Sequence, residues 1–418
     1  MAFIAPAGTP LSLGDLASGA LRSLATGSME HLRRQLCQAT ARERVWLVST
    51  GRAAMTLALE GMKRAARDPQ RVEVIVPGYT CYSVPAAIER AGLVPRLCDV
   101  DPATLSPDLG SLVGIDTRRV LAIVSANLYG LPNALADLED FARRHGLFML
   151  DDAAQALGAR YQGRPVGSFG DAGLCSFDKG KNITTLQGGV LVAGSGDLRD
   201  ALDSVTTGLL AASPVGTLGT LCKLPLYALL LRPWAYGAVR RLPLGLGTTP
   251  YEPDYPIAPY SRALTGLAAL QLARLGEYTG VRVRNAGRLR EALEGLPGFS
   301  MPRVLPGAEP AYVRYPVFVE PRRRAGVIVA LERAGIGATA SYPLALMDVP
   351  EVARRLPGDQ QPTPGAREVA RRIVTLPTHA YSPHDLGRRI ADVDMGLPGG
   401  DTKFQVRGSA NSAKVGRS

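Results

Sequence analysis

Short apolar runs typical of β-strands alternate with stretches of helical spacing over residues 46–195. Two of the helical stretches are 53–66 and 134–146. Strands that alternate with helices predict a mainly parallel sheet with helices on both faces, which is an α/β fold. Ligands of such sheets bind at the carboxyl ends of the strands. The strand-like runs are 45–49, 72–77, 94–100, 119–126, 146–152, 172–177 and 188–193.

The pattern changes on either side of this block. From residue 262 the spacing predicts one long helix that ends near Pro297, and a strand over 311–320 and a helix over 324–335 follow it. The last residues are small and polar, as in disordered segments. We therefore expect a helical lead-in, 1–45; a large domain, 46–260, with an apolar insert near 200–260; a long helix with a small C-terminal α/β domain, 261–395; and a disordered tail, 396–418.

Composition and charge exclude several classes of protein. Apolar residues make up 46% of the chain and charged residues 20%, as in ordinary globular proteins. The net charge of +11 comes from scattered arginines without a zinc-knuckle, basic-zipper or RNA-recognition pattern, so we expect no nucleic-acid partner. Five separated cysteines and four histidines predict neither disulfides nor a metal site. No export signal is evident at the start, and we expect a cytoplasmic protein.

Lysine is used sparingly, and its placement points to chemistry. The chain has six lysines against 42 arginines, yet Lys179 and Lys181 stand two residues apart in CSFDKGKNITTLQGGVLVA. An arginine is effectively always protonated, whereas an ε-amine can lose its proton and attack a carbonyl carbon. This stretch therefore indicates covalent catalysis by a lysine.

Other chemically useful residues follow neighbouring strands. An apolar strand ends in Asp151-Asp152, with Gln155 three residues later; a lone Asp here most often caps a helix. The glycine turn of Thr50-Gly51-Arg52 opens a helix, whose free N–H groups suit a phosphate. Together with Ser176 and a lysine, these residues match the needs of pyridoxal phosphate: an amine, a carboxylate for the pyridine nitrogen, and donors for the phosphate.

From about residue 45 to 395 the chain resembles the DegT/StrS-type sugar aminotransferases, which are fold type I pyridoxal-phosphate enzymes. The resemblance is carried by TGRAAMTLAL, VIVPGYTCYSVPAAIERAGLVPRLCDVD, GIGATASYP, LPTHAYS and, most specifically, the run from DDAAQ to SFDKGKN. It implies a large mainly parallel sheet domain, a smaller C-terminal domain and a homodimer.

The resemblance also implies roles for individual residues. Lys181 is the implied Schiff-base lysine, and Asp152 is the implied partner of the pyridine nitrogen. Gln155 lies near the ring hydroxyl, and Ser176 binds the phosphate together with the backbone of Gly51 and Arg52. Lys179 has no counterpart role, and we interpret it as a solvated turn residue.

Three positions depart from the family pattern. An aromatic residue of the family stacks on the cofactor ring where this chain has Cys81 followed by Tyr82; we expect Tyr82 at the cofactor, with Cys81 as the alternative. Tyr260-Ser261-Arg262 replaces an N-x-R motif whose Asn reaches the partner subunit's phosphate. Ser341 stands where His usually precedes Tyr-Pro.

The implied reaction moves the amino group of glutamate to a keto-sugar, most often nucleotide-linked, for polysaccharide or secondary-metabolite biosynthesis. A cyclitol acceptor and a non-catalytic relative that binds a partner remain alternatives, whereas dehydration is disfavoured because that sister group replaces the lysine with histidine. The insert is expected to be a lid or an interfacial patch. Residues 224–239 are too short and interrupted to span a bilayer, and we expect them to be covered in a dimer. Alternatively, 224–241 touches a membrane surface, with Trp234 and Arg240-Arg241 at the interface.

Overall fold

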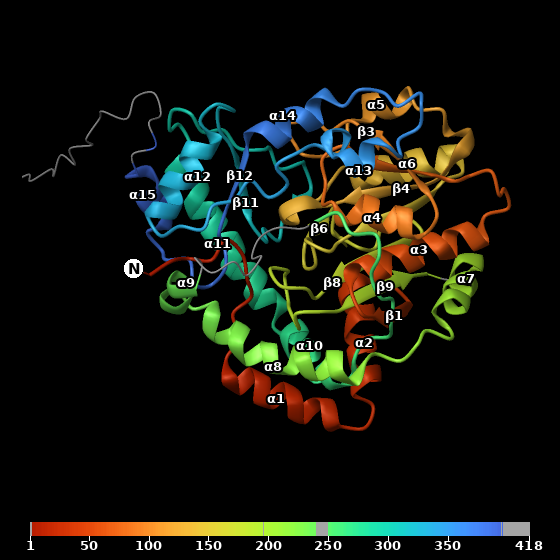
Figure 1. The fold of residues 1–418 in the computed structure, drawn as a ribbon, viewed down its shortest axis with the longest axis horizontal. Helices are drawn as coiled ribbons and strands as arrows, with labels where there is room; N and C mark the ends of the chain where they lie inside the picture. The colour runs from red at the N-terminus through yellow and green to blue at the C-terminus, as the bar shows by residue number, and fades with distance from the viewer. Residues whose placement is uncertain (1, 195, 240–249, 394, 396–418) are drawn as a thin grey trace, which may run out of the picture.

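The computed structural model describes residues 2–194, 196–239, 250–393 and 395, and a seven-stranded mixed sheet forms its centre (Figure 1). The strand order is β1-β9-β8-β5-β4-β2-β3. Neighbouring strands from β8 to β3 are parallel, whereas β9 is antiparallel to both β1 and β8. The α/β prediction is therefore confirmed. The strands are β1 (Arg44–Val48), β2 (Glu73–Pro77), β3 (Val94–Cys98), β4 (Val120–Ala126), β5 (Phe148–Asp152), β8 (Ala172–Ser176) and β9 (Gly189–Ala193).

Helices cover both faces of this sheet. Because successive side chains of a strand point to opposite faces, Val74 and Val76 of β2 join one apolar cluster and Ile75 joins the other. All three side chains are fully buried. The first cluster includes α3 (Gly51–Ala65), α4 (Ser83–Arg90) and α7 (Asp197–Thr206), and the second includes α2 (Ser28–Thr40), α6 (Leu135–His145) and α10 (Thr265–Ala273).

A smaller unit forms around a two-stranded antiparallel sheet of β11 (Tyr315–Phe318) and β12 (Ile373–Leu376). The strand expected over 311–320 is thus four residues long, because only these residues pair. Ile4 forms an isolated bridge to Ile336, which brings the N-terminal segment to this unit (Figure 1). Its helices are α11 (Leu275–Leu293), α12 (Arg324–Arg333) and α15 (Leu386–Ala391). The shorter elements are α5 (Leu109–Val113), β6 (Arg160–Tyr161), β7 (Arg164–Pro165), β10 (Ala308–Glu309), α13 (Pro350–Ala353) and α14 (Pro364–Arg372).

The long helix expected from residue 262 is two helices, and the prediction of one was wrong. Residues 262–264 form a 3-10 turn, and α10 and α11 are separated at Arg274, whose φ and ψ of −101° and 9° leave the helical range. The change of direction lets α10 bury its side chains under the large sheet and α11 bury its own in the small unit. Apolar spacing is the same on both sides of such a break, so the sequence pattern did not reveal it.

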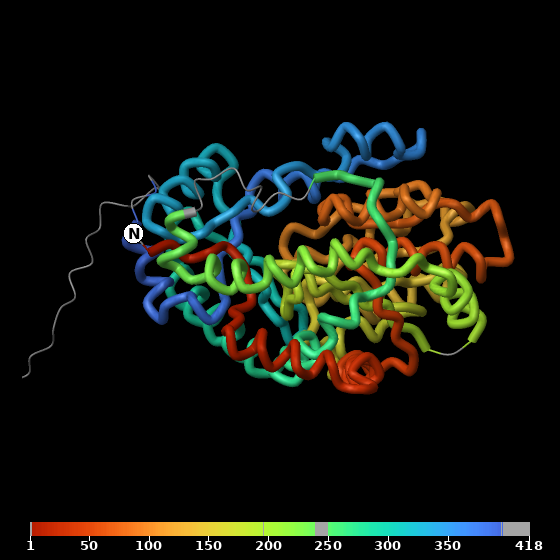
Figure 2. Tube along the Cα trace, turned by 60° about the horizontal axis from the view of Figure 1, so that its bottom comes forward, coloured from red at the N-terminus to blue at the C-terminus, as the bar shows by residue number. Residues whose placement is uncertain are grey.

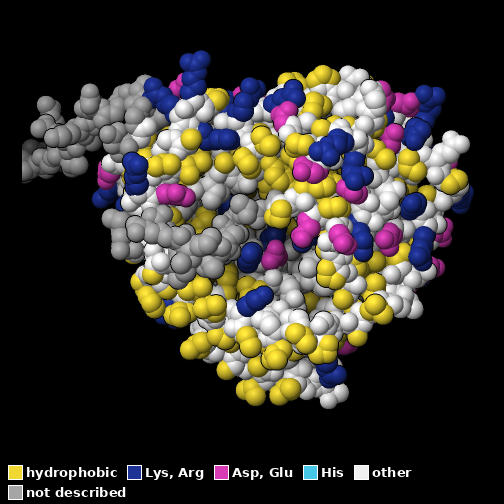
Figure 3. All heavy atoms as spheres, viewed as in Figure 1, with side chains coloured by type: hydrophobic (Ala, Val, Ile, Leu, Met, Phe, Trp, Pro, Cys, Tyr) yellow, Lys and Arg dark blue, Asp and Glu magenta, His cyan; other side chains and the backbone are white. Residues whose placement is uncertain are grey.

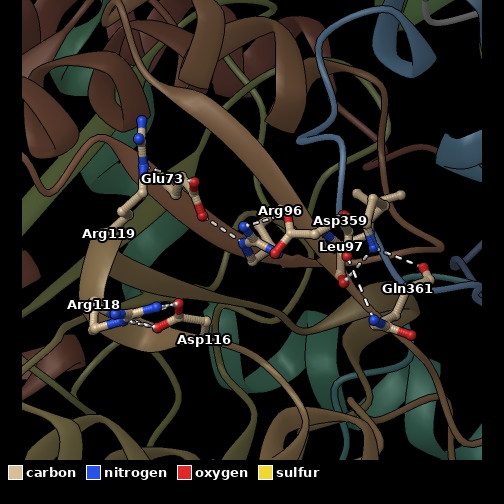
Figure 4. A network of polar contacts seen from close by, with 9 residues as sticks. Glu73, Arg96, Leu97, Asp116, Arg118, Arg119, Asp359 and Gln361 are labelled. Carbon is tan, nitrogen blue, oxygen red and sulfur yellow. Dashed lines mark hydrogen bonds and ion pairs between the residues drawn. The ribbon is translucent and has the colours of Figure 1, made fainter.

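A buried ion pair fastens the outer edge of the sheet to the C-terminal part of the chain (Figure 4). Arg96 on β3 donates to Glu73 on β2, and both side chains are almost fully buried. Arg96 also donates to Asp359 at 3.0 Å, and the amide of Leu97 donates to the side chain of Gln360 at 2.8 Å. These contacts hold the segment of Asp359 and Gln360, which lies between β11 and β12 in the chain, against β3.

The apolar insert forms two helices, α8 (Pro214–Leu230) and α9 (Pro233–Val239), after α7. Both views place α8 across the molecule beside α1 (Leu13–Leu24) (Figure 2). Across the described chain, no helix has both the length and the apolar character that crossing a bilayer requires. Arg240-Arg241 and the tail of 396–418 lie outside the described residues, and the domain boundary near residue 260 stays a prediction.

Candidate active site

A cavity of about 620 Å³ opens where β5 and β8 end and α3 begins. Asp152, the last residue of β5, lines this cavity. The loop after β8 brings Lys181 to the same cavity. The strand ends thus meet at one edge of the sheet, as in other parallel sheets. Of the expected site residues, Gly51, Arg52, Asp152, Gln155, Ser176 and Lys181 all line this cavity.

Asp152 is the carboxylate that faces the cavity. One of its oxygens accepts a hydrogen bond from the amide of Ala154 at 2.8 Å, and only 8% of the residue is exposed. Burial raises the pKa of this carboxyl, while the amino group of Lys181 and the amide of Ala154 act in the opposite direction. A positive group at the second oxygen would therefore be strongly attracted.

Asp151 points to the other side of the sheet, as alternation along β5 requires. Its two oxygens accept from Asn127 Nδ2 at 2.8 Å and from the amides of Gly167 at 2.6 Å and Phe169 at 3.2 Å. Complete burial raises the pKa of Asp151 from 3.8 to about 7. It is a structural residue that holds the loop of 167–169 beside β5.

The loop that carries the two lysines is tied down at its backbone. The hydroxyl of Thr9 donates to the carbonyl of Lys181 at 2.7 Å. The side chain of Lys181 is half-buried, whereas Lys179, which also lines the cavity, is exposed. Lys179 is thus more exposed than Lys181, as expected of a turn residue, but it lies at the cavity rather than away from it.

Arg282 of α11 holds this loop from behind, and the sequence analysis missed it. Its guanidinium donates to the carbonyl of Asn182 at 3.0 Å, to that of Lys181 at 3.2 Å and to the hydroxyl of Thr9 at 2.9 Å. No carboxylate of the described residues pairs with it, and complete burial lowers its pKa to about 10. Nothing in the spacing VRVRN distinguishes this arginine from its exposed neighbours.

The start of α3 offers a cradle for an anion. Thr50 caps the helix by accepting from Ala53, which leaves the amides of Gly51 and Arg52 at the open end. A Cβ on Gly51 would lie 2.9 Å from Cβ of Ser176, so glycine keeps space between the helix start and the serine. The side chain of Arg52 turns to Glu252 at 3.2 Å instead.

Aromatic and amide groups form another wall. Gln155 accepts from the amide of Tyr129 at 3.0 Å and donates to the hydroxyl of Tyr342 at 3.0 Å. Cys81 lines the cavity, but Tyr82 does not. The hydroxyl of Tyr82 is bonded to both the amide and the carbonyl of Leu344, and its ring lies 5.7 Å from the ring of Tyr342, which lines the cavity. Whether Tyr82 or Cys81 contacts the cofactor ring therefore stays a prediction.

Comparison with known proteins decides the family. The sequence pattern of the DegT/DnrJ/EryC1/StrS aminotransferase family matches residues 16–207 and 262–392. The chain belongs to this family. It is a pyridoxal-phosphate-dependent aminotransferase of fold type I, as the resemblance implied.

Individual relatives of this aminotransferase differ in their reactions. A dTDP-3-amino-3,4,6-trideoxy-alpha-D-glucose transaminase of Streptomyces venezuelae is 29% identical over 82% of this chain and 80% of that one. A dTDP-4-dehydro-2,6-dideoxy-D-glucose 3-dehydratase of Saccharopolyspora spinosa is 28% identical over 76% and 68%. An L-glutamine:scyllo-inosose aminotransferase of Streptomyces griseus is 41% identical over 36% and 35%.

A solved structure shares the fold of the aminotransferase over nearly its whole length. S. venezuelae DesV in complex with ketimine intermediate superposes with a TM-score of 0.71 over 90% of this chain and 92% of that chain, at 24% identity. The family match, by contrast, leaves out residues 208–261, which contain α8 and α9. The expected apolar insert is therefore an addition to the part of the chain that the family pattern describes.

The residues present fit pyridoxal phosphate. The space that Gly51 keeps beside Ser176 suits a phosphate, since open amides of a helix start lie there. Asp152 has an oxygen for which no described residue supplies a hydrogen bond, and it faces the cavity that Lys181 lines. A cationic ring nitrogen would offset the cost of burying that carboxylate.

Proposed function

We propose that the aminotransferase moves the amino group of glutamate to a keto-sugar linked to a nucleotide, in polysaccharide or secondary-metabolite biosynthesis. The observation that carries this proposal is the meeting of Asp152 and Lys181 at one cavity, with the anion cradle of Gly51 and Ser176 at its side. The relatives that act on dTDP-linked sugars support the acceptor.

Each residue has a proposed task. Bound pyridoxal phosphate supplies an electron sink and carries nitrogen between the two substrates. Lys181 holds the cofactor covalently and, once released, moves the α-proton of glutamate. Asp152 keeps the pyridine nitrogen protonated, Gln155 lies at the ring hydroxyl, and Ser176 with the amides of Gly51 and Arg52 binds the phosphate. Cys81 takes the place that we expected for Tyr82, since it lines the cavity.

A cyclitol acceptor is the second candidate, and the inosose aminotransferase relative favours it. Dehydration remains disfavoured although one relative is a dehydratase, because Lys181 stands where that group has histidine. A non-catalytic role would leave the facing pair of Asp152 and Lys181 without a purpose.

We further propose a cytoplasmic homodimer. Five free cysteines suit a reducing compartment. Apolar side chains are exposed over α1 and α8 (Figure 3), among them Leu24 at 79% and Val215 at 81%, and Trp234 of α9 is 63% exposed. A dimer contact is the first explanation of this surface, and a membrane-surface contact through 224–241 is the alternative. Flotation with anionic liposomes at low salt separates the two, because only the membrane contact brings the protein to the lipid fraction.

The acceptor is tested with purified holoenzyme, glutamate and a panel of nucleotide-linked keto-sugars together with scyllo-inosose. We expect an amino-sugar product, seen by mass, and an equal amount of 2-oxoglutarate. A product from inosose alone selects the second candidate. The absence of both products with every acceptor, while the protein remains folded and coloured, would contradict the proposed function.

A further inference from the structure

Helix α8 presents three different stripes to its surroundings. The side chains that line the cavity are spaced i, i+3, i+4 and i+7, which is one face of a helix. They are Lys223, Leu226, Tyr227 and Leu230, and Leu231 continues the wall just after the helix. We call these five residues the cavity stripe. Because it lies within residues 208–261, this wall is not part of what the family pattern describes.

The other two stripes fix the orientation of the helix. Thr220, Leu224 and Ala228 are buried against the body of the protein. Val215, Leu218 and Leu229 are exposed on the outside, and Leu226 of the cavity stripe, at 53% exposed, lies at the rim between the two faces. The hydroxyl of Tyr227 accepts from the amide of Thr9 at 3.2 Å, which anchors the cavity stripe next to the backbone that holds Lys181. The cavity stripe therefore faces the reacting end of the site.

Lys223 is the charged residue of the cavity stripe. Arg52 pairs with Glu252, and Arg314 donates to the hydroxyls of Thr339 and Ser341. For Lys223, no described residue supplies a hydrogen bond or an ion pair, and the sequence has no Asp or Glu from Ser204 to Tyr251 that could neutralise it within the insert. Asp178 also lines the cavity but forms no ion pair with Lys223. A lysine without an ion-pair partner, next to apolar side chains, favours an anionic ligand with an apolar body.

We propose that the cavity stripe binds the part of the acceptor substrate that lies beyond the sugar. The negative charge of a diphosphate meets Lys223, and the body attached to it rests on Leu226 and Leu230. This inference depends on the proposed function, because it assigns the binding site for the nucleotide-diphosphate portion of a keto-sugar acceptor, a portion that stays attached during the reaction. The hydroxyl of Tyr227 is already occupied, so the cavity stripe has no group with which to read the edge of a base.

A diphosphate on an apolar or flat body occurs in both nucleoside diphosphates and prenyl diphosphates. The test therefore measures the binding of dTDP, UDP, GDP and farnesyl diphosphate to the holoenzyme by calorimetry. We expect the three nucleotides to bind with dissociation constants within about fivefold of one another. The Lys223→Gln variant is expected to weaken every diphosphate by about tenfold, since hydrogen bonds to charged groups are worth that much.

Matched variants separate the cavity stripe from the rest of the helix. Leu230→Asn should weaken the same ligands, whereas Leu229→Asn, on the exposed stripe one residue away, should not. Arg232→Gln removes an exposed cation that does not line the cavity and should leave binding unchanged. Far-ultraviolet circular dichroism and the colour of the bound cofactor check that each variant is folded.

The outcomes assign or overturn the inference. If farnesyl diphosphate binds more tightly than the nucleotides and loses affinity in the same variants, the subsite is supported. The body attached to the diphosphate is then a hydrocarbon chain rather than a nucleoside. Wild-type affinity for dTDP in Lys223→Gln overturns the inference, and so does a strong preference for one base. Amination of scyllo-inosose without diphosphate binding overturns the subsite but leaves the aminotransferase standing, whereas failure of the proposed function shows as no amination at all.

Discussion

Two walls of one cavity are built in opposite ways. Hydrogen bonds from Thr9 and Arg282 fix the backbone at Lys181, and the amide of Ala154 fixes the carboxylate of Asp152. On α8 the wall is a row of side chains on a helix whose outer face is exposed, and one of them is a lysine that no described residue pairs with. Chemistry that is common to a family needs rigid placement of reacting groups. Recognition of a particular substrate needs only a surface of the right charge and shape, which an added helix supplies.

The largest expected effect comes from removing the amine of Lys181. Lys181→Ala should abolish both the visible absorbance of the cofactor–lysine linkage and the transfer of nitrogen from glutamate, because no other group makes that bond. Lys179→Ala, two residues away and exposed, is the matched control and should keep its colour and most of its activity. Absorbance spectra and 2-oxoglutarate assays measure both.

Asp152→Asn should separate cofactor binding from proton transfer. An amide cannot hold the pyridine nitrogen protonated, so we expect turnover to fall by about 10²–10⁴-fold while the cofactor stays bound and the KM for glutamate changes little. Steady-state kinetics and a spectrum of the bound cofactor test this. Near-normal turnover in Asp152→Asn, with a severe loss in Asp151→Asn, would show that the carboxylates have been assigned in the wrong order.

Asp151 makes the free energy of unfolding depend on pH. Since its folded-state pKa is raised from 3.8 to about 7, its protonated form is favoured in the folded state, and the stability it contributes is present below about pH 4 and is lost as pH rises through about 7. The shift corresponds to about 4 kcal/mol of unfolding free energy. Urea unfolding from pH 4.5 to 7.5 should therefore show a wild-type advantage over Asp151→Asn that shrinks as pH rises; a constant difference would contradict this.

Arg282 is expected to act as a positioning residue. Arg282→Met leaves the carbonyls of Lys181 and Asn182 without their donor, so the free energy of unfolding should fall by about 3 kcal/mol. The loosened loop should lower kcat more than it changes the KM for glutamate, and Arg282→Lys should restore part of the loss. Arg284→Met, exposed on the same helix, is the control. Equal behaviour of the two methionine variants would remove Arg282 from the account.

The sequence predicted the rigid wall better than the added one, for physical reasons. Burial on both faces of a sheet leaves continuous apolar runs, and reactive groups at strand ends follow those runs directly, as Asp152 follows β5. The break at Arg274 left no such mark, because apolar spacing continues through it. The place of Arg282 depends on contacts with residues about a hundred and more positions away, which local spacing does not encode.

The insert was recognised as unusual, but its three stripes were not. Apolar residues lie on every face of α8, so the pattern alone did not distinguish the cavity side from the buried and exposed sides. The choice between Cys81 and Tyr82 was left open for a related reason, because residue type does not reveal that Cys81 lines the cavity while the hydroxyl of Tyr82 is bonded to Leu344. Both depend on tertiary contacts, which residue type alone does not encode.

The central claim is that Lys181 is the lysine that carries the cofactor, and chemical trapping tests it most directly. Borohydride reduces the bond between cofactor and amine, and peptide mass mapping then locates the pyridoxyl group. The account predicts the mark on Lys181, with none on Lys179 or on Lys223. A mark on Lys179, or on neither lysine of the loop, would contradict an aminotransferase built around Lys181 and Asp152.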